Sequence, residues 1–600
     1  MRTRLWLPLL AALLALATPL AAQDYDVLLR GGQVLDGTDA QARVADVAIK
    51  NGKIARIGNL PNARARTVID ARGLFVTPGF IDMHSHADWG FGEPELNRAL
   101  NNLTQGITTV VVGQDGRSAW RVGETIGDAI RVWSAQGLAE NAILLVGHGS
   151  VRREVMGEAE RAPTAEELER MRALVRQAMA GGAYGISTGL SYVPGRFSTT
   201  EEVIALTREV KPYGGFYISH LRNQGDQLLE SVYETIRIGR ETGVPVVHSH
   251  FKASGWQNFG KARLAMERIA EARAAGVAAW VDVYPWTTSS DGIDVDLLPP
   301  AAFTIGRADD SAALPNVPFE TMSSEELAAF ILAGNGWIRR TTTAGWLAAR
   351  PRTELLELAR GTVRQLLRGS NRQVGRAALL ARLQDPVLGD SIRRIIGGAL
   401  DRRGPELYVI EDAADDRLDG KTLAEAAGLL GVDVVEAAIR LDLMDAHVTH
   451  FHMSEPDVEE ILGWDFTAIS TDGTLPYFGI GIPHPRSYGS FTRLIRHYSL
   501  DRQVLALPRA IRAATGLAAD MIGLKDRGYV KEGQWADIVA LDPKTIDSCA
   551  TYARPHCYST GIEYLLVNGV VTLERGRYTG ALAGHILTPR AVIPTGIATE

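Results

Sequence analysis

Eight short apolar runs, separated by longer amphipathic stretches, limit the fold more than any other feature of this 600-residue sequence. Two of the stretches, "EELERMRALVRQAMAGG" and "LLESVYETIRIGRETG", have helical periodicity and end at glycine. Strands that alternate with helices are typical of an α/β fold with a parallel sheet. We predict a (β/α)8 TIM-like barrel, and periodicity alone leaves an open doubly wound sheet as the alternative. The predicted strands are residues 79–84, 107–113, 142–147, 183–189, 215–220, 244–250, 278–285 and 467–473.

The residues at the strand ends favour the barrel. The first run ends in His84 and His86, the fifth in His220 and the sixth in His250, and the eighth carries Asp472. Residues two apart on a strand face the same side, and a barrel brings the carboxyl ends of its strands to one mouth. Because imidazole and carboxylate groups that converge there suit Zn²⁺, we predict a metal site made of these five residues.

Both ends of the chain have the two-residue periodicity of short strands. We expect residues 23–77 and 526–600, the latter including a C-terminal tail, to form one small β-sandwich, with the barrel spanning residues 78–525. Residues 302–376 have helical patterning where no barrel strand fits. They predict a helical insertion between strands seven and eight, either a lid over the mouth or a surface and oligomer contact.

The first 22 residues have the layout of a secretory signal peptide: two arginines, an apolar run and a small-residue end at Ala21-Ala22. The run is short for a membrane span, so we expect cleavage after Ala22 and a periplasmic or secreted protein. An uncleaved anchor, which would tie the protein to a membrane, is the alternative. The two cysteines, Cys549 and Cys557, either pair in an oxidising compartment or stay unpaired.

The net charge of −7 argues against a nucleic-acid partner, which would favour a basic patch. Residues 185–189, "GISTG", fit the G-x-S-x-G pattern of serine hydrolases, but the helix that this motif requires does not follow directly. The sequence thus points to a small-molecule substrate and to metal chemistry.

An ordered set of motifs resembles the D-aminoacylase (N-acyl-D-amino-acid deacylase) branch of the metal-dependent amidohydrolase superfamily. The motifs are "PGFIDMHSHAD", "GITTVVVG", "GISTGLSYVPG", "YISHLRNQGD", "VPVVHSHFKASG", "DVYPW", "STDGT" and "DRGYVKEGQWADIVALDP". The resemblance covers about residues 24–587 apart from the insertion. It implies a barrel with a β-domain from both termini, one or two Zn²⁺ per chain, and Asp472 as the catalytic base. The implied metal ligands are His84, His86, His220 and His250.

One motif departs from this branch. Its members usually carry a metal-binding cysteine in a "GNCG"-like turn, and this chain has "GQDG", with Asp115 at that position. Either Asp115 ligates or bridges two metals, since a carboxylate has two oxygens, or the site is degenerate. Lys252 is the rival bridging residue.

The resemblance also implies that Tyr192, Lys252, Tyr284 and Ser290 hold a carboxylate of the substrate. Arg222 either adds to this set or pairs with a neighbouring acid. Asp88 and His148 either orient the metal ligands or are structural.

We therefore predict an exported, zinc-dependent amidohydrolase that cleaves a linear amide, most simply an N-acyl-D-amino acid. Asp472 would take a proton from an activated water and deliver it to the leaving nitrogen. The alternatives are a dipeptidase or other hydrolase of an amide conjugate with a free carboxylate, and then a cyclic-amide hydrolase. A non-catalytic periplasmic binding protein with a degenerate metal site is the alternative from another class.

Overall fold

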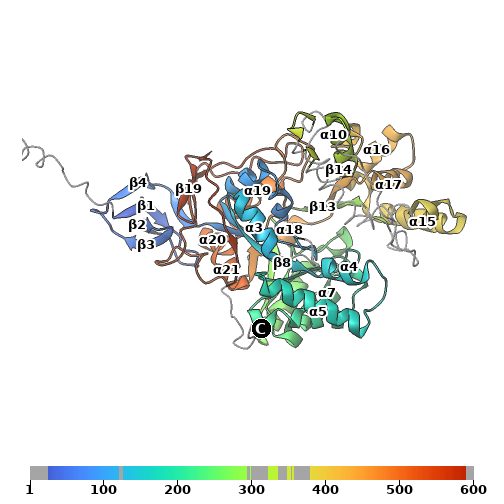
Figure 1. Cartoon of the computed structure of the whole chain (residues 1–600), viewed down its shortest axis with the longest axis horizontal. Coiled ribbons are helices and arrows are strands. Elements are labelled where there is room, and N and C mark those ends of the chain that lie inside the picture. Colours follow the sequence, from blue (N-terminus) through green and yellow to red (C-terminus); the bar gives the residue numbers. More distant parts are fainter. Residues whose placement is uncertain are drawn as a thin grey trace, which may run out of the picture.

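A computed structural model of the chain describes residues 24–120, 126–293, 297–298, 322–334, 348–352, 355–356 and 379–589. The predicted signal peptide and most of the predicted insertion at residues 302–376 lie outside these residues. Strands from the N-terminal segment form one end of the molecule, the barrel lies centrally, and a group of helices that includes α15–α17 forms the other end (Figure 1).

Eight parallel strands form a nearly closed barrel, which confirms the predicted fold. They follow one another around the sheet in chain order, from β6 to β16. Between these two strands, a parallel bridge joins Ser85 to Gly473, and the Met83 amide donates to the Ile469 carbonyl at 3.5 Å. The strands are β6 (Phe80–Asp82), β7 (Ile107–Val112), β8 (Asn141–Gly147), β9 (Gly185–Gly189), β10 (Phe216–His220), β11 (Val246–His248), β12 (Ala279–Val283) and β16 (Thr467–Ile469).

Helices cover the outside of the barrel, so its strands are buried on both faces and consist mostly of apolar residues. The sequence sets the helix ends: Thr164 forms a capping box with Glu167 at the start of α5, and Gly243 ends α7 in the left-handed conformation. The helices around the barrel are α2 (Leu100–Leu103), α3 (Ile126–Gln136), α4 (His148–Met156), α5 (Ala165–Ala180), α6 (Thr200–Arg208), α7 (Leu228–Thr242), α8 (Lys261–Ala274), α18 (Glu455–Gly463), α19 (Arg486–Arg493), α20 (Leu507–Ala514) and α21 (Gly516–Ile522).

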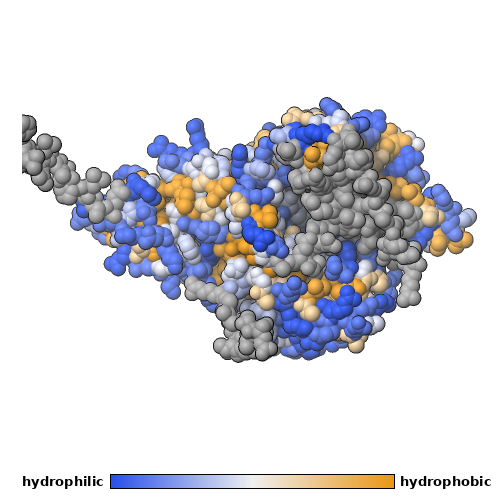
Figure 2. Space-filling view, in the orientation of Figure 1, coloured by the Kyte–Doolittle hydropathy of each residue, from blue (hydrophilic) through white to orange (hydrophobic). Residues whose placement is uncertain are grey.

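Strands from both termini share one nine-stranded sheet and one apolar core, as predicted. The link between the two halves is the antiparallel pair β5–β17. Hydrophilic residues spread over much of this end in the view of Figure 2. The strands are β1 (Tyr25–Val34), β2 (Arg43–Lys50), β3 (Lys53–Gly58), β4 (Ala65–Asp70), β5 (Phe75–Pro78), β17 (Ile538–Leu541), β18 (Ile562–Val567), β19 (Val570–Glu574) and β20 (Arg577–Tyr578), while β21 (Ile586–Leu587) pairs with barrel strand β8.

The interval between barrel strands β12 and β16 has its own sheet and core, where the sequence predicted only a helical insertion. The antiparallel sheet has the order β13-β15-β14. Its strands escaped prediction because β13 reads "TSSDG" and β15 reads "HVTHF", without an apolar run. The elements are β13 (Thr288–Gly292), α10 (Ser324–Gly334), α15 (Pro386–Arg403), β14 (Tyr408–Asp412), α16 (Leu423–Leu430), α17 (Val434–Leu443) and β15 (His447–Phe451).

Cys549 and Cys557 form a disulfide, which decides between the two alternatives left by the sequence. Within the loop that it closes, the Tyr552 hydroxyl lies 2.9 Å from Thr288 Oγ1 on β13. The bond thus fixes a loop that packs against the sheet beside the barrel mouth. Among the described residues, no helix is both long and apolar enough to cross a membrane.

A buried polar network joins the barrel to the terminal sheet. Arg527 pairs with Asp537, and the side chains of both residues are less than 5% exposed. Asp537 Oδ1 accepts from the Asn568 amide at 2.7 Å, and the Asn568 side chain donates to Asn141 Oδ1 on β8 at 2.7 Å. Removing Asp537 would take away the nearest counter-charge of the buried Arg527.

We therefore expect Asp537→Ala to destabilise the protein by about 3 kcal/mol, since it leaves the buried Arg527 with only the Asp526 carboxylate, 3.8 Å from its Nε, as a counter-charge. Chemical and thermal denaturation measure the loss. Asp415→Ala, which removes the partner of the exposed Arg417 and the N-cap of a short 3-10 helix, is the control and should cost no more than about 1 kcal/mol. An Asp537→Ala protein as stable as the control would contradict the role of this network.

Candidate metal centre

Six side chains from five strand ends meet at the barrel mouth. His220 is the last residue of β10, and the others lie two to four residues beyond their strands. Three of them have left-handed backbones: Asp115 with φ 56°, His250 with φ 34° and Asp472 with φ 51°. Non-glycine residues rarely adopt this conformation, and such strain gathers at functional sites. The six are the predicted ligands His84, His86, Asp115, His220, His250 and Asp472.

Asp115 lies between two pairs of imidazoles, and each of its oxygens faces one pair. Oδ2 is 3.6 Å from His84 Nε2 and 3.4 Å from His86 Nε2. Oδ1 is 3.7 Å from His220 Nδ1 and 3.4 Å from His250 Nε2. The ligand atoms thus form two groups, each within 4.8 Å, an arrangement that suits a carboxylate bridging two cations. The first group is His84, His86, Asp115 and Asp472, and the second is Asp115, His220 and His250.

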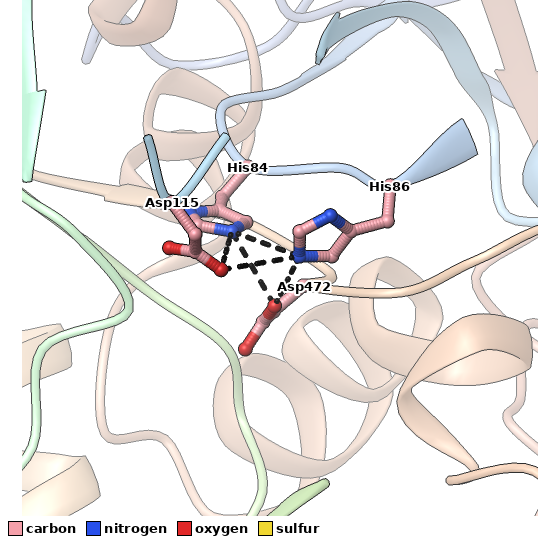
Figure 3. Close-up of side chains that lie close together, drawn as sticks. All are labelled: His84, His86, Asp115 and Asp472. Atoms are coloured by element: carbon pink, nitrogen blue, oxygen red, sulfur yellow. Dashed lines mark hydrogen bonds and ion pairs between the residues drawn. The ribbon is translucent and has the colours of Figure 1, made fainter. Parts of the chain in front are cut away.

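Asp472 contributes one oxygen to the first group, and its other oxygen faces the guanidinium group of Arg486. Its Oδ1 lies 3.4 Å from His84 Nε2 and 3.3 Å from His86 Nε2, so that these three residues and Asp115 face one another (Figure 3). Its Oδ2 accepts a hydrogen bond from Arg486 Nη1 at 2.6 Å. Asp472 therefore has one oxygen among the ligands and one in a buried ion pair.

The electrostatics of the cluster favour a bound cation. Burial opposes the charge of Asp115, but the neighbouring histidines outweigh burial and hold the pKa of this carboxyl well below its usual value. Burial likewise opposes charge on His86, yet Asp115 and Asp472 raise its pKa to about 10. The two carboxylates thus draw positive charge into a buried site, and a divalent ion supplies such charge directly.

Two local features fit the donors to a metal. His220 Nδ1 is buried and has no hydrogen-bond partner, although it lies in the second ligand group. The Ser249 hydroxyl donates to Asp282 Oδ2 at 2.8 Å, so its oxygen accepts from His84 Nδ1 at 2.6 Å. The neutral His84 ring then carries its proton on Nδ1, and Nε2, which faces the cluster, has a free lone pair for a metal. Nitrogen and carboxylate donors in this arrangement suit Zn²⁺.

The four residues expected to hold a substrate carboxylate lie together beside the ligands. The Tyr192 ring packs against His220 with centroids 4.5 Å apart. Lys252 Nζ lies 5.3 Å from the centre of the buried Tyr284 ring. The carbonyl oxygen of Ser290 accepts from Arg486 Nη2 at 3.5 Å. These contacts connect the four residues to the cluster through His220 and through Arg486, the partner of Asp472.

Two further residues of the site were not predicted from the sequence. Arg486 is a buried cation that pairs with Asp472 and lies 5.1 Å from the centre of the Tyr284 ring. Gln224 Oε1 accepts from Lys252 Nζ at 3.0 Å. Only the position of Arg486 shortly after the eighth strand hinted at its place. Nothing local in "HPRSYGS" distinguishes it from a surface arginine.

Other residues singled out in the sequence lie outside the cluster. Arg222 makes two hydrogen bonds to Glu234, so it pairs with a neighbouring acid. His148 Nε2 lies 2.9 Å from Glu202 Oε1, and no described contact joins it to a ligand. Ser187 of the "GISTG" motif is buried within β9 and donates to the Gly113 carbonyl, so it is no exposed nucleophile.

The remaining two candidates lie close to the ligands without joining either group. Burial raises the pKa of Asp88 to about 6, against the opposing charge of His86. Lys252 Nζ is 2.9 Å from His250 Nδ1, on the side of the ring away from Asp115. Asp115, rather than Lys252, therefore lies between the two histidine pairs.

Comparison with known proteins agrees with this site. Residues 67–210 and 390–573 match the model of the amidohydrolase family. A D-aminoacylase of Alcaligenes xylosoxydans xylosoxydans is 32% identical over 95% of this chain and 99% of its own length. The chain therefore belongs to the amidohydrolase family, and is a metal-dependent hydrolase of carbon–nitrogen bonds in linear amides.

Solved structures place the chain more narrowly. A structure of D-aminoacylase that concerns its binuclear metal centre is 30% identical, with a TM-score of 0.71 over 94% of this chain and 100% of the other. The N-acyl-D-glutamate deacylase of Bordetella bronchiseptica, solved with zinc and a phosphonate inhibitor, is 29% identical, with a TM-score of 0.70 over 94% and 99%. The predicted D-aminoacylase branch is confirmed.

The position of Asp115 between both histidine pairs leads to a prediction about metal content. Because each of its oxygens faces one pair of imidazoles, Asp115→Ala should at least halve the metal bound per chain, as measured by elemental analysis after dialysis. Asp415→Ala, far along the chain in an exposed pair, should keep the full complement. Unchanged metal in Asp115→Ala would remove this residue from the ligand set.

Proposed function

We propose that the protein is a zinc-dependent deacylase of N-acyl-D-amino acids. The observation that carries the proposal is a buried imidazole–carboxylate cluster with two buried cations, Lys252 and Arg486, at its side. The named activities of the relatives support a substrate that joins an acyl group to an amino acid. The zinc of the Bordetella bronchiseptica structure supports that metal.

The substrate's carboxylate is the group that the two cations suit. Lys252 and Arg486 approach the Tyr284 ring at 5.3 and 5.1 Å, so both cations lie around one buried aromatic side chain. An arginine and a lysine together with hydroxyl donors make charge-assisted hydrogen bonds to a carboxylate. The amino-acid half would thus bind beside Tyr284, with its amide directed to the metal cluster.

The histidines and Asp115 would hold the metal, with Asp472 at its side. When bound, a divalent ion polarises a carbonyl group and lowers the pKa of water. Asp472 Oδ1 faces His84 and His86, which places it to accept a proton from water in the mouth and to deliver that proton to the leaving nitrogen. Arg486 keeps Asp472 ionised, because the pair holds the pKa of the carboxyl well below its usual value against the effect of burial.

A hydrolysis screen tests this proposal. We expect the zinc-loaded protein to release amino acid from N-acetyl-D-leucine and to leave N-acetyl-L-leucine largely intact. Asp472→Asn should lower kcat by about 10²–10⁴-fold, because the proton acceptor is lost, while the metal content is kept. The measurements are amine release and elemental analysis on the same samples.

The surface variant Asp415→Asn is the control and should match the wild type. In the same assay Arg486→Met should raise KM by about tenfold or more, since a charged anchor is removed. A fully active Asp472→Asn protein would contradict the assigned base. Cleavage of dipeptides in place of acyl-D-amino acids would favour the dipeptidase alternative.

We also propose that the protein is exported to the periplasm or secreted. The signal-like layout of residues 1–22 supports this, and so does the disulfide between Cys549 and Cys557, a bond that persists in oxidising compartments. Expression of the full chain in a bacterial host should give a periplasmic protein whose first residue is Gln23. Recovery in the cytoplasm with Met1 intact would contradict export.

A further inference from the structure

A third carboxylate, Asp291, lies at the barrel mouth and belongs to neither ligand group. It is a half-buried residue of β13, directly after Ser290. The Tyr192 hydroxyl donates to Asp291 Oδ2 at 2.9 Å, and the Tyr192 ring packs against the ligand His220. Asp291 is therefore one tyrosine side chain away from the metal cluster.

Asp291 also borders the proposed carboxylate-binding residues. The carbonyl oxygen of its neighbour Ser290 accepts from Arg486, which fixes β13 beside the Asp472–Arg486 pair. The charge of Asp291 also acts on several ionisable groups at this side of the mouth. Besides burial, it raises the pKa of Tyr192, and it acts in the same direction on the pKa of Lys252, Tyr284 and Arg486.

We propose that Asp291 determines specificity, favouring an N-acyl-D-amino acid whose side chain carries an ammonium or guanidinium group and disfavouring one with a second carboxylate. The inference rests on the proposed function, because it concerns the side chain of the same substrate. With the main carboxylate held by Lys252 and Arg486, the side chain extends toward the rest of the mouth, where Asp291 lies.

Elementary electrostatics supports a preference for a cationic over an acidic substrate side chain. An ionised carboxylate only accepts hydrogen bonds, so it matches a cationic donor and repels another carboxylate. The Tyr192 hydroxyl has one proton and already donates it to Asp291, so it is not available to an acidic side chain. An acidic substrate would therefore meet a charge of its own sign and lose a donor, a combination that selects against it.

The main rival role for Asp291 is to position Tyr192. Two variants separate the roles. Asp291→Asn removes the charge but keeps an oxygen that can accept from Tyr192, whereas Tyr192→Phe removes the hydrogen bond and keeps the charge. A specificity role predicts that the preference among side chains follows the charge. A positioning role predicts that it follows the hydrogen bond.

The test compares kcat/KM of the zinc-loaded protein on N-acetyl-D-lysine, N-acetyl-D-leucine and N-acetyl-D-glutamate. We expect the wild type to prefer the lysine over the glutamate substrate by about a hundredfold or more. Asp291→Asn should reduce this ratio at least about tenfold, while kcat/KM on N-acetyl-D-leucine changes little. Tyr192→Phe should lower activity on all three and keep the ratio, and the exposed-site control Asp415→Asn should match the wild type.

Equal wild-type activity on the lysine and glutamate substrates would overturn the inference, and so would an Asp291→Asn ratio equal to that of the wild type. A ratio lost equally in Tyr192→Phe would assign Asp291 to positioning. If none of the amides is cleaved, the proposed function fails instead. Calorimetric binding of D-lysine and D-glutamate to the wild type and to Asp291→Asn then still decides the inference, which equal affinities in the wild type would overturn.

Discussion

The structure depends on one shared carboxylate. Asp115 places one oxygen against His84 and His86 and the other against His220 and His250, so the two halves of the ligand set meet through it. Buried charges without partners are costly, and here burial opposes the charge of every member of the cluster. A divalent cation on each side of Asp115 would resolve this conflict, and this is why the site is best understood as a metal centre.

The barrel allows a folded chain to hold such a cluster of buried charges together. Apolar strands buried on both faces hold the strand ends in place, and the ligands extend from those ends. The strained backbones of Asp115, His250 and Asp472 lie at these ends, where the surrounding packing can maintain them. The loop around Tyr552 contacts β13, and the Ser290 carbonyl of β13 accepts from Arg486, so the inserted sheet contributes to the site as well as to the fold.

Much of this could be predicted from the sequence, because the informative features are local. The eight apolar runs gave the barrel strands, and His84-Ser85-His86 at a strand end indicated ligands. Asp115 stood out only because it replaces an expected cysteine. Arg486 and Asp291 could not be found in this way, since their roles come from burial and from partners outside their own motifs, Asp472 being 14 and Tyr192 being 99 residues away. The polar strands β13 and β15 have no apolar pattern to reveal them.

Anomalous X-ray diffraction at the zinc absorption edge would show whether Asp115 bridges two ions. We expect two anomalous peaks, one beside His84 and His86 and one beside His220 and His250, each about 2.0–2.2 Å from a different oxygen of Asp115, as a bridging role requires. A single peak, or two peaks of which neither lies within bonding distance of Asp115, would contradict it.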